Sequence, residues 1–210
     1  MKLFFCLISS LVFLTFSASA GAATCTYETW EWDTKRKISV NHRRVEKEKD
    51  RLDIHERGSI EGCSVCREDQ VTIALEGLPT FEICRKFEMP LRRAVEKAKT
   101  AGFPIVSIVG YRVGKSKGSV DSKGLRTEFS NHSFGAAIDF NSETNGLYDT
   151  CVEFGPKCKL LRGGAYDPKG RTAITRASPL YLAMTKEGFK WGGEIAAKQK
   201  DFMHFSPTGM

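Results

Sequence analysis

The sequence predicts an α+β fold in which a small antiparallel sheet, packed by helices, follows a β-rich N-terminal extension. Apolar residues recur at helical spacing in two stretches, after Pro90 and after Ser178. Elsewhere apolar residues alternate with polar ones or form short runs of strand length. The 210 residues suffice for one domain with a substantial core in addition to an extension.

Residues 1–20 have the pattern of a secretory signal peptide. Lys2 precedes an apolar run, and Ala18-Ser19-Ala20 offers a cleavage site of small residues. The run is too short to span a bilayer comfortably, which disfavours a membrane anchor. A lipid anchor is also disfavoured, because Thr24 rather than a small residue directly precedes Cys25. We expect a secreted or periplasmic protein with no stable membrane insertion after the signal is removed.

Residues 21–84 are expected to form the β-rich extension. Residues 25–33 alternate around Tyr27 and two tryptophans, and residues 70–78 carry apolar side chains at strand period. The stretch between them is highly charged and could be mobile. No repeat or low-complexity tract occurs.

Residues 85–210 are expected to form the second domain. A helix should start at Pro90 and end at Gly102, and another should be capped by Ser178 and end at Gly188. Strands are expected at 105–109, 136–141 and 202–206. Between the last two strands, the glycine-rich residues 145–175 should form a wall or lid of a cleft.

The cysteine count fits an exported protein. One of the seven cysteines, Cys6, lies in the signal, which leaves an even number in the mature chain and allows three disulfides among fifteen pairings. Cys151 and Cys158 bracket a short loop and are the pair that we favour. Cys63 and Cys66 could form a redox pair or half of a zinc ribbon, but no second CxxC follows, so a structural role is favoured.

Two segments, 130–140 and 201–205, contain two histidines and two aspartates beside small or apolar residues. A catalytic zinc site needs three such ligands, an open fourth position and a separate base, so hydrolysis is the chemistry that they indicate. The helical motif HExxH is absent, because Ser59 stands where a second histidine should follow His55. The other two of the four histidines, His42 and His55, lie in charged stretches and should be on the surface.

The spacing of these residues suits ligands on loops and strands. The seven-residue step from His132 to Asp139 fits a loop ligand followed by a strand ligand, with Gly135 allowing the backbone to turn between them. The step from Asp201 to His204 would place a carboxylate at a loop end and an imidazole on the following strand.

Four segments in this order resemble the zinc metallopeptidases of bacterial cell walls. They are IVSIVGYR at 105–112, SNHSFGAAIDFN at 130–141, GFKWGG at 188–193 and DFMHFS at 201–206. The family includes D-alanyl-D-alanine carboxypeptidases, D,D-dipeptidases and L-alanyl-D-glutamate endopeptidases, and the resemblance covers roughly residues 85–207. It implies that zinc is bound by His132, Asp139 and His204.

The resemblance also implies roles around the metal. Asp201 would be the general base, and Arg112 would bind substrate or polarise the scissile carbonyl. Ser130 and Trp191 are expected to contact substrate, although Trp191 could instead pack a helix onto the sheet. Many relatives have Ser and Gln after the arginine, where this chain has Val113-Gly114-Lys115, and several have Glu at the position of Ser206.

We therefore expect an exported Zn²⁺-dependent peptidase that cuts peptidoglycan stem peptides, either as an L-Ala-D-Glu endopeptidase or as a D-Ala-D-Ala carboxypeptidase. The alternative is a non-catalytic zinc-containing module that binds cell wall or protein, as in the similar Hedgehog signalling domain, but such a module would not need the base Asp201. The net charge of +7 would also suit nucleic acid, yet an exported chain should meet anionic wall polymer instead.

Overall fold

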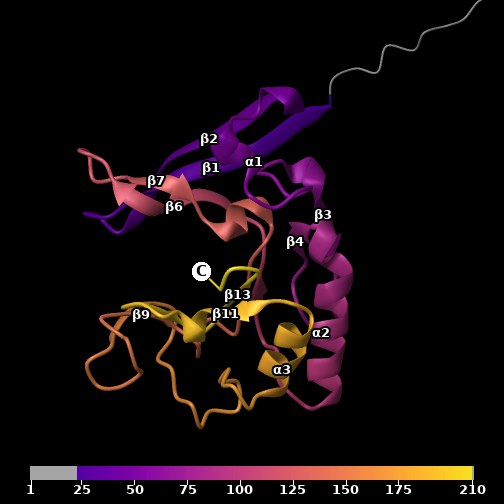
Figure 1. Ribbon diagram of the computed structural model, residues 1–210, viewed down its shortest axis with the longest axis vertical. Coiled ribbons are helices and arrows are strands. Elements are labelled where there is room, and N and C mark those ends of the chain that lie inside the picture. The colour runs from indigo at the N-terminus through magenta and orange to yellow at the C-terminus, as the bar shows by residue number, and fades with distance from the viewer. Residues whose placement is uncertain (1–22, 210) are drawn as a thin grey trace, which may run out of the picture.

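The computed structural model describes residues 23–209 and confirms the α+β fold (Figure 1). The predicted signal, residues 1–20, lies outside the described residues. The molecule has an upper half, built on the strands β1, β2, β6 and β7, and a lower half, which contains the helices α2 and α3 and the strands β9, β11 and β13. No helix within residues 23–209 combines the length and apolar character needed to cross a membrane.

The upper half contains a four-stranded sheet of order β2-β1-β6-β7. Its strands are β1 (Thr24–Asp33), β2 (Ile38–Glu48), β6 (Val113–Val120) and β7 (Arg126–Phe129). β1 pairs antiparallel with β2 and parallel with β6, so the sheet joins strands from both sides of the predicted boundary at residue 84.

The charged middle of the extension is a regular strand, β2, rather than an irregular segment. β2 is an edge strand whose side chains are largely exposed, so it shows little of the apolar alternation by which strands are recognised. Its backbone is ordered by hydrogen bonding to β1, and its Lys and Arg side chains suit an exposed sheet edge.

Short elements and two disulfides complete the extension. The short elements are η1 (Lys49–Arg51), α1 (Ile54–Arg57), η2 (Arg67–Asp69), β3 (Gln70–Ile73) and β4 (Phe81–Cys84). Cys63 and Cys66 are not bonded to each other: the disulfides are Cys25–Cys66 and Cys63–Cys84. The structural role predicted for this CxxC is therefore confirmed, with partners that are remote in sequence.

Two helices cover the core of the lower half, as predicted. After η3 (Arg85–Phe87), α2 runs over Glu88–Thr100 and buries Leu91, Ala94, Val95 and Ala98. α3 (Pro179–Lys186) starts with Pro179 at its first position, and the Ser178 side chain accepts a hydrogen bond from Tyr181 N. The two helices pack on each other and on a large apolar cluster.

The predicted antiparallel sheet of the lower half has the order β11-β13-β8-β5. The three predicted strands are shorter than expected: β5 (Ile108–Val109), β8 (Ile138–Phe140) and β13 (His204–Ser206). A fourth strand that was not predicted, β11 (Lys190–Trp191), completes the sheet. Side chains of β8 and β13 such as Ile138, Phe140 and Phe205 are fully buried. This central position holds both strands rigidly.

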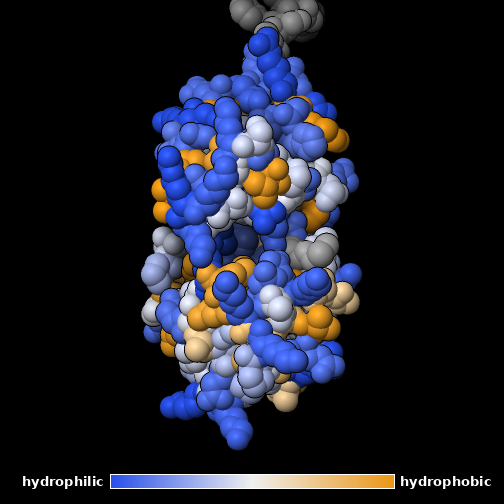
Figure 2. Space-filling model, turned by 90° about the vertical axis from the view of Figure 1, so that its left-hand side faces the viewer, coloured by the Kyte–Doolittle hydropathy of each residue, from blue (hydrophilic) through white to orange (hydrophobic). Residues whose placement is uncertain are grey.

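A second small sheet, of order β10-β9-β12, lies beside the first. It consists of β9 (Leu147–Asp149), β10 (Lys159–Arg162) and β12 (Lys200–Asp201). The disulfide Cys151–Cys158, which the sequence predicted, closes the β9–β10 hairpin. Figure 2 shows a hollow between the upper and lower halves with hydrophilic residues at its floor.

Candidate metal centre and active site

Two of the predicted ligands are cross-strand neighbours in the central sheet. β13 pairs antiparallel with β8, and the register places His204 directly opposite Asp139. Residues in such a pair project from the same face of a sheet. The packed core that fixes the two strands therefore also fixes the imidazole beside the carboxylate.

The third predicted ligand lies on a short helical turn that leads into β8. His132 belongs to η4 (Asn131–Phe134), which ends at Gly135 in the left-handed conformation with φ 60°. A Cβ at this position would overlap the Gln70 side chain and the Cys84 backbone, so glycine is required for both reasons. The predicted turn between a loop ligand and a strand ligand is thus observed.

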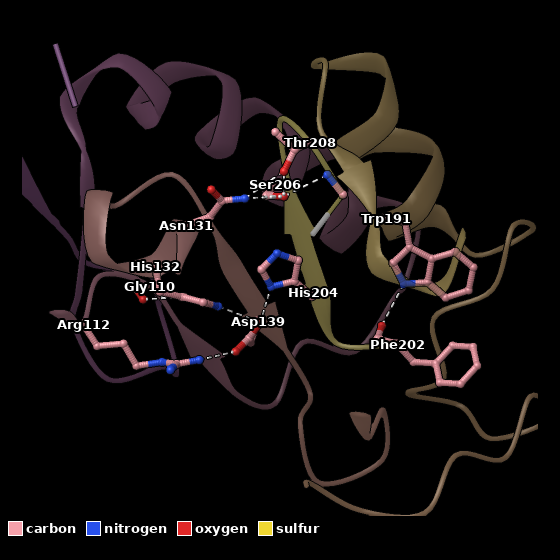
Figure 3. A network of polar contacts seen from close by, with 11 residues as sticks. Gly110, Arg112, Asn131, His132, Asp139, Trp191, Phe202, His204, Ser206 and Thr208 are labelled. Carbon is pink, nitrogen blue, oxygen red and sulfur yellow. Dashed lines mark hydrogen bonds and ion pairs between the residues drawn. The ribbon is translucent and has the colours of Figure 1, made fainter. Parts of the chain in front are cut away.

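The donor atoms of these three residues converge (Figure 3). Asp139 Oδ1 lies 3.0 Å from both His132 Nε2 and His204 Nδ1. His132 Nδ1 donates to Gly110 O at 2.8 Å, which leaves Nε2 as the nitrogen that faces Asp139. In a tetrahedral zinc site with bonds of about 2.0–2.1 Å, neighbouring donors lie about 3.3 Å apart, so this donor set fits zinc in chemistry and in spacing.

Burial and charge act in opposite directions on the three groups, all of which are at most 6% exposed. Burial lowers the pKa of His132 more than the Asp139 carboxylate raises it, so this imidazole stays neutral. Although burial alone would raise the pKa of Asp139, the neighbouring His132 and His204 hold it well below its usual range. Burial alone would lower the pKa of His204, but the hydrogen bond and charge of Asp139 raise it. A cation bound here would compete with protonation of His204, because a ligating imidazole nitrogen carries no proton.

Asp201 lies beside this group rather than in it. Burial and the charge of Asp139 raise the pKa of Asp201 to about 6, although the positive charge of His204 opposes them. Within residues 23–209, no hydrogen-bond partner reaches Asp201 Oδ1 or His204 Nε2. Gly192 has no side chain, and its backbone packs against Asp201 and His204. The segment at residues 191–193 therefore packs directly against the candidate site.

Arg112 reaches the centre from the segment before β6. Its guanidinium donates to Asp139 Oδ2 at 3.0 Å, and its backbone N donates to His132 O at 3.1 Å. The Arg112 side chain is 25% exposed, and Arg112 Nε is buried without a partner among residues 23–209. Arg112 thus contacts the predicted ligand Asp139 and remains partly exposed to solvent.

Ser130 and Trp191, the other predicted substrate contacts, are buried. Ser130 precedes the η4 turn, and its carbonyl accepts a hydrogen bond from Ser133 N. Trp191 Nε1 donates to Phe202 O at 2.8 Å, and its ring packs against Tyr181 of α3. These contacts of Trp191 are those of a residue that packs α3 onto the sheet. Contact of either residue with substrate stays a prediction.

Two cations near the site were not singled out by the sequence. Lys117 of β6 lowers the pKa of Asp201 through its charge, and Arg162 of β10 interacts with Asp201, Asp139 and Arg112. The two surface histidines are exposed, as predicted. One further potential ligand set within residues 23–209 contains Cys25 and Cys66, which are joined as a disulfide.

Residues 123–207 match a family model described as D-alanyl-D-alanine carboxypeptidase. The matched segment contains all three predicted ligands and Asp201, whereas Arg112 and the extension precede it. No curated protein and no solved structure matches the chain. The match confirms the resemblance predicted from the sequence motifs: in residues 123–207 this chain has the pattern of the D-alanyl-D-alanine carboxypeptidase family of peptidases.

Proposed function

We propose that this protein is an exported zinc peptidase that hydrolyses peptide bonds of peptidoglycan stem peptides. The convergence of His132 Nε2 and His204 Nδ1 on Asp139 Oδ1 carries the proposal, together with the family match. When bound by these donors, zinc would supply Lewis-acid polarisation of a carbonyl and acidification of a water.

Asp201 would act as the general base. Its pKa of about 6 leaves it ionised at neutral pH yet basic enough to accept a proton from water. Because Asp201 Oδ1 has no hydrogen-bond partner among residues 23–209, it is free to receive that proton. Asp201 would then pass the proton to the amine that leaves when the peptide bond breaks.

Arg112 would orient the substrate. One guanidinium nitrogen holds Asp139, while the partly exposed side chain can still donate to a substrate carboxylate or carbonyl oxygen. The same hydrogen bond holds the Asp139 carboxylate toward the two histidines. Residues 145–175 would border the bound peptide, and their disulfide would hold this wall in place.

The proposed export rests on two features. Residues 1–20 have a signal-like sequence, and six cysteines form three disulfides, which persist in oxidising compartments. We propose a secreted or periplasmic location, where stem peptides are accessible.

Defined muropeptides incubated with the purified protein, with products read by mass spectrometry, test the function and identify the bond that is cut. Asp201→Asn keeps the size of the side chain but cannot accept the proton, so zinc content should persist while turnover falls about a hundredfold. Asp149→Asn, the same change on β9, is the matched control and should leave turnover unchanged. Stem-peptide binding with zinc but without any cleavage by the wild type would favour the binding module instead.

A further inference from the structure

Arg162 is the last residue of β10, on the hairpin that borders the metal centre. β9 pairs with β10 on one side and with β12 on the other, and the register aligns Arg162 with Leu147 and Leu147 with Asp201. Neighbouring strands are about 4.8 Å apart, so Arg162 and Asp201 lie about 10 Å apart in one row. A register shift between Leu160 and Arg162 interrupts the regular alternation of side chains at this point of β10. The charge of Arg162 acts on Asp201, Asp139 and Arg112, so its side chain extends toward the proposed base.

The backbone that follows Arg162 packs closely against the residues that follow β8, the strand of Asp139. Gly164 N donates to Ser142 O at 2.9 Å. Gly163 has φ +76°, and a Cβ there would lie 2.6 Å from Ser142 O and 2.9 Å from the end of Met203, the neighbour of His204. A side chain at either glycine would push the end of β10 away from Ser142 and Glu143, which follow β8. Arg162 is therefore held at a fixed place beside the site, although its side chain remains partly exposed.

The positive charge of Arg162 lies near two carboxylates but is in direct contact with neither of them. Burial and the nearby charge of Arg112 lower the pKa of Arg162, whereas Asp139 and Asp201 act in the opposite direction. Among residues 23–209, none forms a hydrogen bond or ion pair with the Arg162 guanidinium. Arg112 likewise has its Nε unpartnered. Two guanidinium groups that repel each other beside a cleft would be stabilised by an anion bound between them.

We propose that Arg162 and Arg112 together bind one carboxylate of the substrate. This inference rests on the proposed function. Arg162 would then select peptides in which the residue that supplies the leaving amine carries a free carboxylate on its Cα. A C-terminal residue meets this requirement, because its carboxylate is separated from the scissile nitrogen by that Cα alone. The carboxylate would fix the peptide so that the scissile carbonyl lies over Asp201 and the predicted metal ligands.

Two stem peptides, identical except for a free or amidated carboxylate at this position, test the proposal. Wild type should prefer the free acid, and Arg162→Gln should lose about 10- to 100-fold in kcat/KM on it, mainly through KM, the range expected for charge-assisted hydrogen bonds. On the amidated peptide, the kcat/KM of Arg162→Gln should equal that of wild type. Arg171→Gln, an exposed arginine outside this sheet, is the matched control and should change neither substrate.

Arg162→Lys keeps the charge but not the forked geometry, and should recover part of the preference for the acid. Equal losses on acid and amide, or no loss on either, would overturn the proposal. The same peptides titrated calorimetrically into Asp201→Asn protein give a readout without turnover: the acid should bind more tightly, and Arg162→Gln should remove the difference. If wild type cleaves neither peptide, the proposed function fails, whereas the binding comparison still decides the role of Arg162.

Discussion

The two halves of the molecule are held together by different forces. The lower half encloses a large apolar cluster in which Leu91, Ile138 and Phe205 are completely buried. The upper half has a much smaller cluster around Tyr27, Leu52 and Val113, and it contains two of the three disulfides. A sheet with one charged, exposed edge buries little apolar surface, so covalent ties replace packing there.

The candidate metal centre lies where the halves meet. Asp139 and His204 stand on strands of the lower core, whereas His132 and Arg112 lie on segments that lead to the upper sheet. Tyr111 N donates to Glu82 O, which ties the segment of Arg112 to the extension. We therefore expect the geometry of the predicted ligands to depend on packing in the lower half. Substrate access and substrate orientation should depend on the disulfide-linked upper half.

Removing a ligand from the rigid half should have the largest effect. His204→Ala leaves two protein ligands, which bind zinc far more weakly, so zinc content and turnover should both be lost, the latter by more than about a thousandfold. Metal analysis by mass spectrometry and muropeptide turnover measure the two effects. His42→Ala and His55→Ala, which alter exposed histidines of the upper half, should change neither. Zinc retained in His204→Ala would remove His204 from the ligand set.

The contrast in packing predicts unequal costs for the same core substitution. Leu91 is fully buried in the large cluster, so Leu91→Ala should lower the free energy of unfolding by about 3–5 kcal/mol. Leu52 lines a surface cavity of about 550 Å³, so water can fill the space that Leu52→Ala creates, and the cost should be about 2 kcal/mol. Urea unfolding of both variants measures the difference. Equal costs would contradict the contrast.

Removing a disulfide should cost more stability in the upper half than in the lower half, which is the opposite of the order expected for the core substitutions. Loop-closure entropy increases with the length of chain enclosed, and the separations are 41 residues for Cys25–Cys66, 21 for Cys63–Cys84 and 7 for Cys151–Cys158. Replacing each pair by alanine should therefore lower the free energy of unfolding by about 4, 3 and 2 kcal/mol. Thermal unfolding of the three variants gives the ranking. A larger loss for the short hairpin disulfide would show that the lower half depends on it more than its core suggests.

Sequence reasoning succeeded where a local pattern determines structure. The Ser178-Pro179 cap predicts α3, and the spacing of apolar residues after Pro90 predicts α2, because both signals act within a few residues. The step from His132 through Gly135 to Asp139 likewise predicts a turn followed by a strand. These signals covered the two helices and the parts of the candidate site that lie in continuous motifs.

Features that depend on remote partners were missed. β2 is a strand because β1 pairs with it, and Cys63 and Cys66 separate because their partners approach from Cys84 and Cys25. Arg162 lies on an exposed strand with no recognisable motif, and only the register through Leu147 places it beside Asp201. Such placements are set by tertiary pairing, which single-sequence periodicity does not contain.

The smallest predicted effect concerns pH. Because burial and the charge of Asp139 raise the pKa of Asp201 to about 6, this carboxyl takes up a proton as the pH falls through that range. A base must be ionised to accept a proton, so kcat/KM should fall about tenfold for each pH unit below the pKa. A dication held by the neighbouring donors would lower the pKa of Asp201, so the midpoint of the acid limb should lie at or below pH 6. Glu68→Gln, a carboxylate of the upper half that bonds Thr26, should leave the limb unchanged. A limb centred above pH 7, or a rate that stays constant down to pH 4, would show that a group other than Asp201 serves as the base.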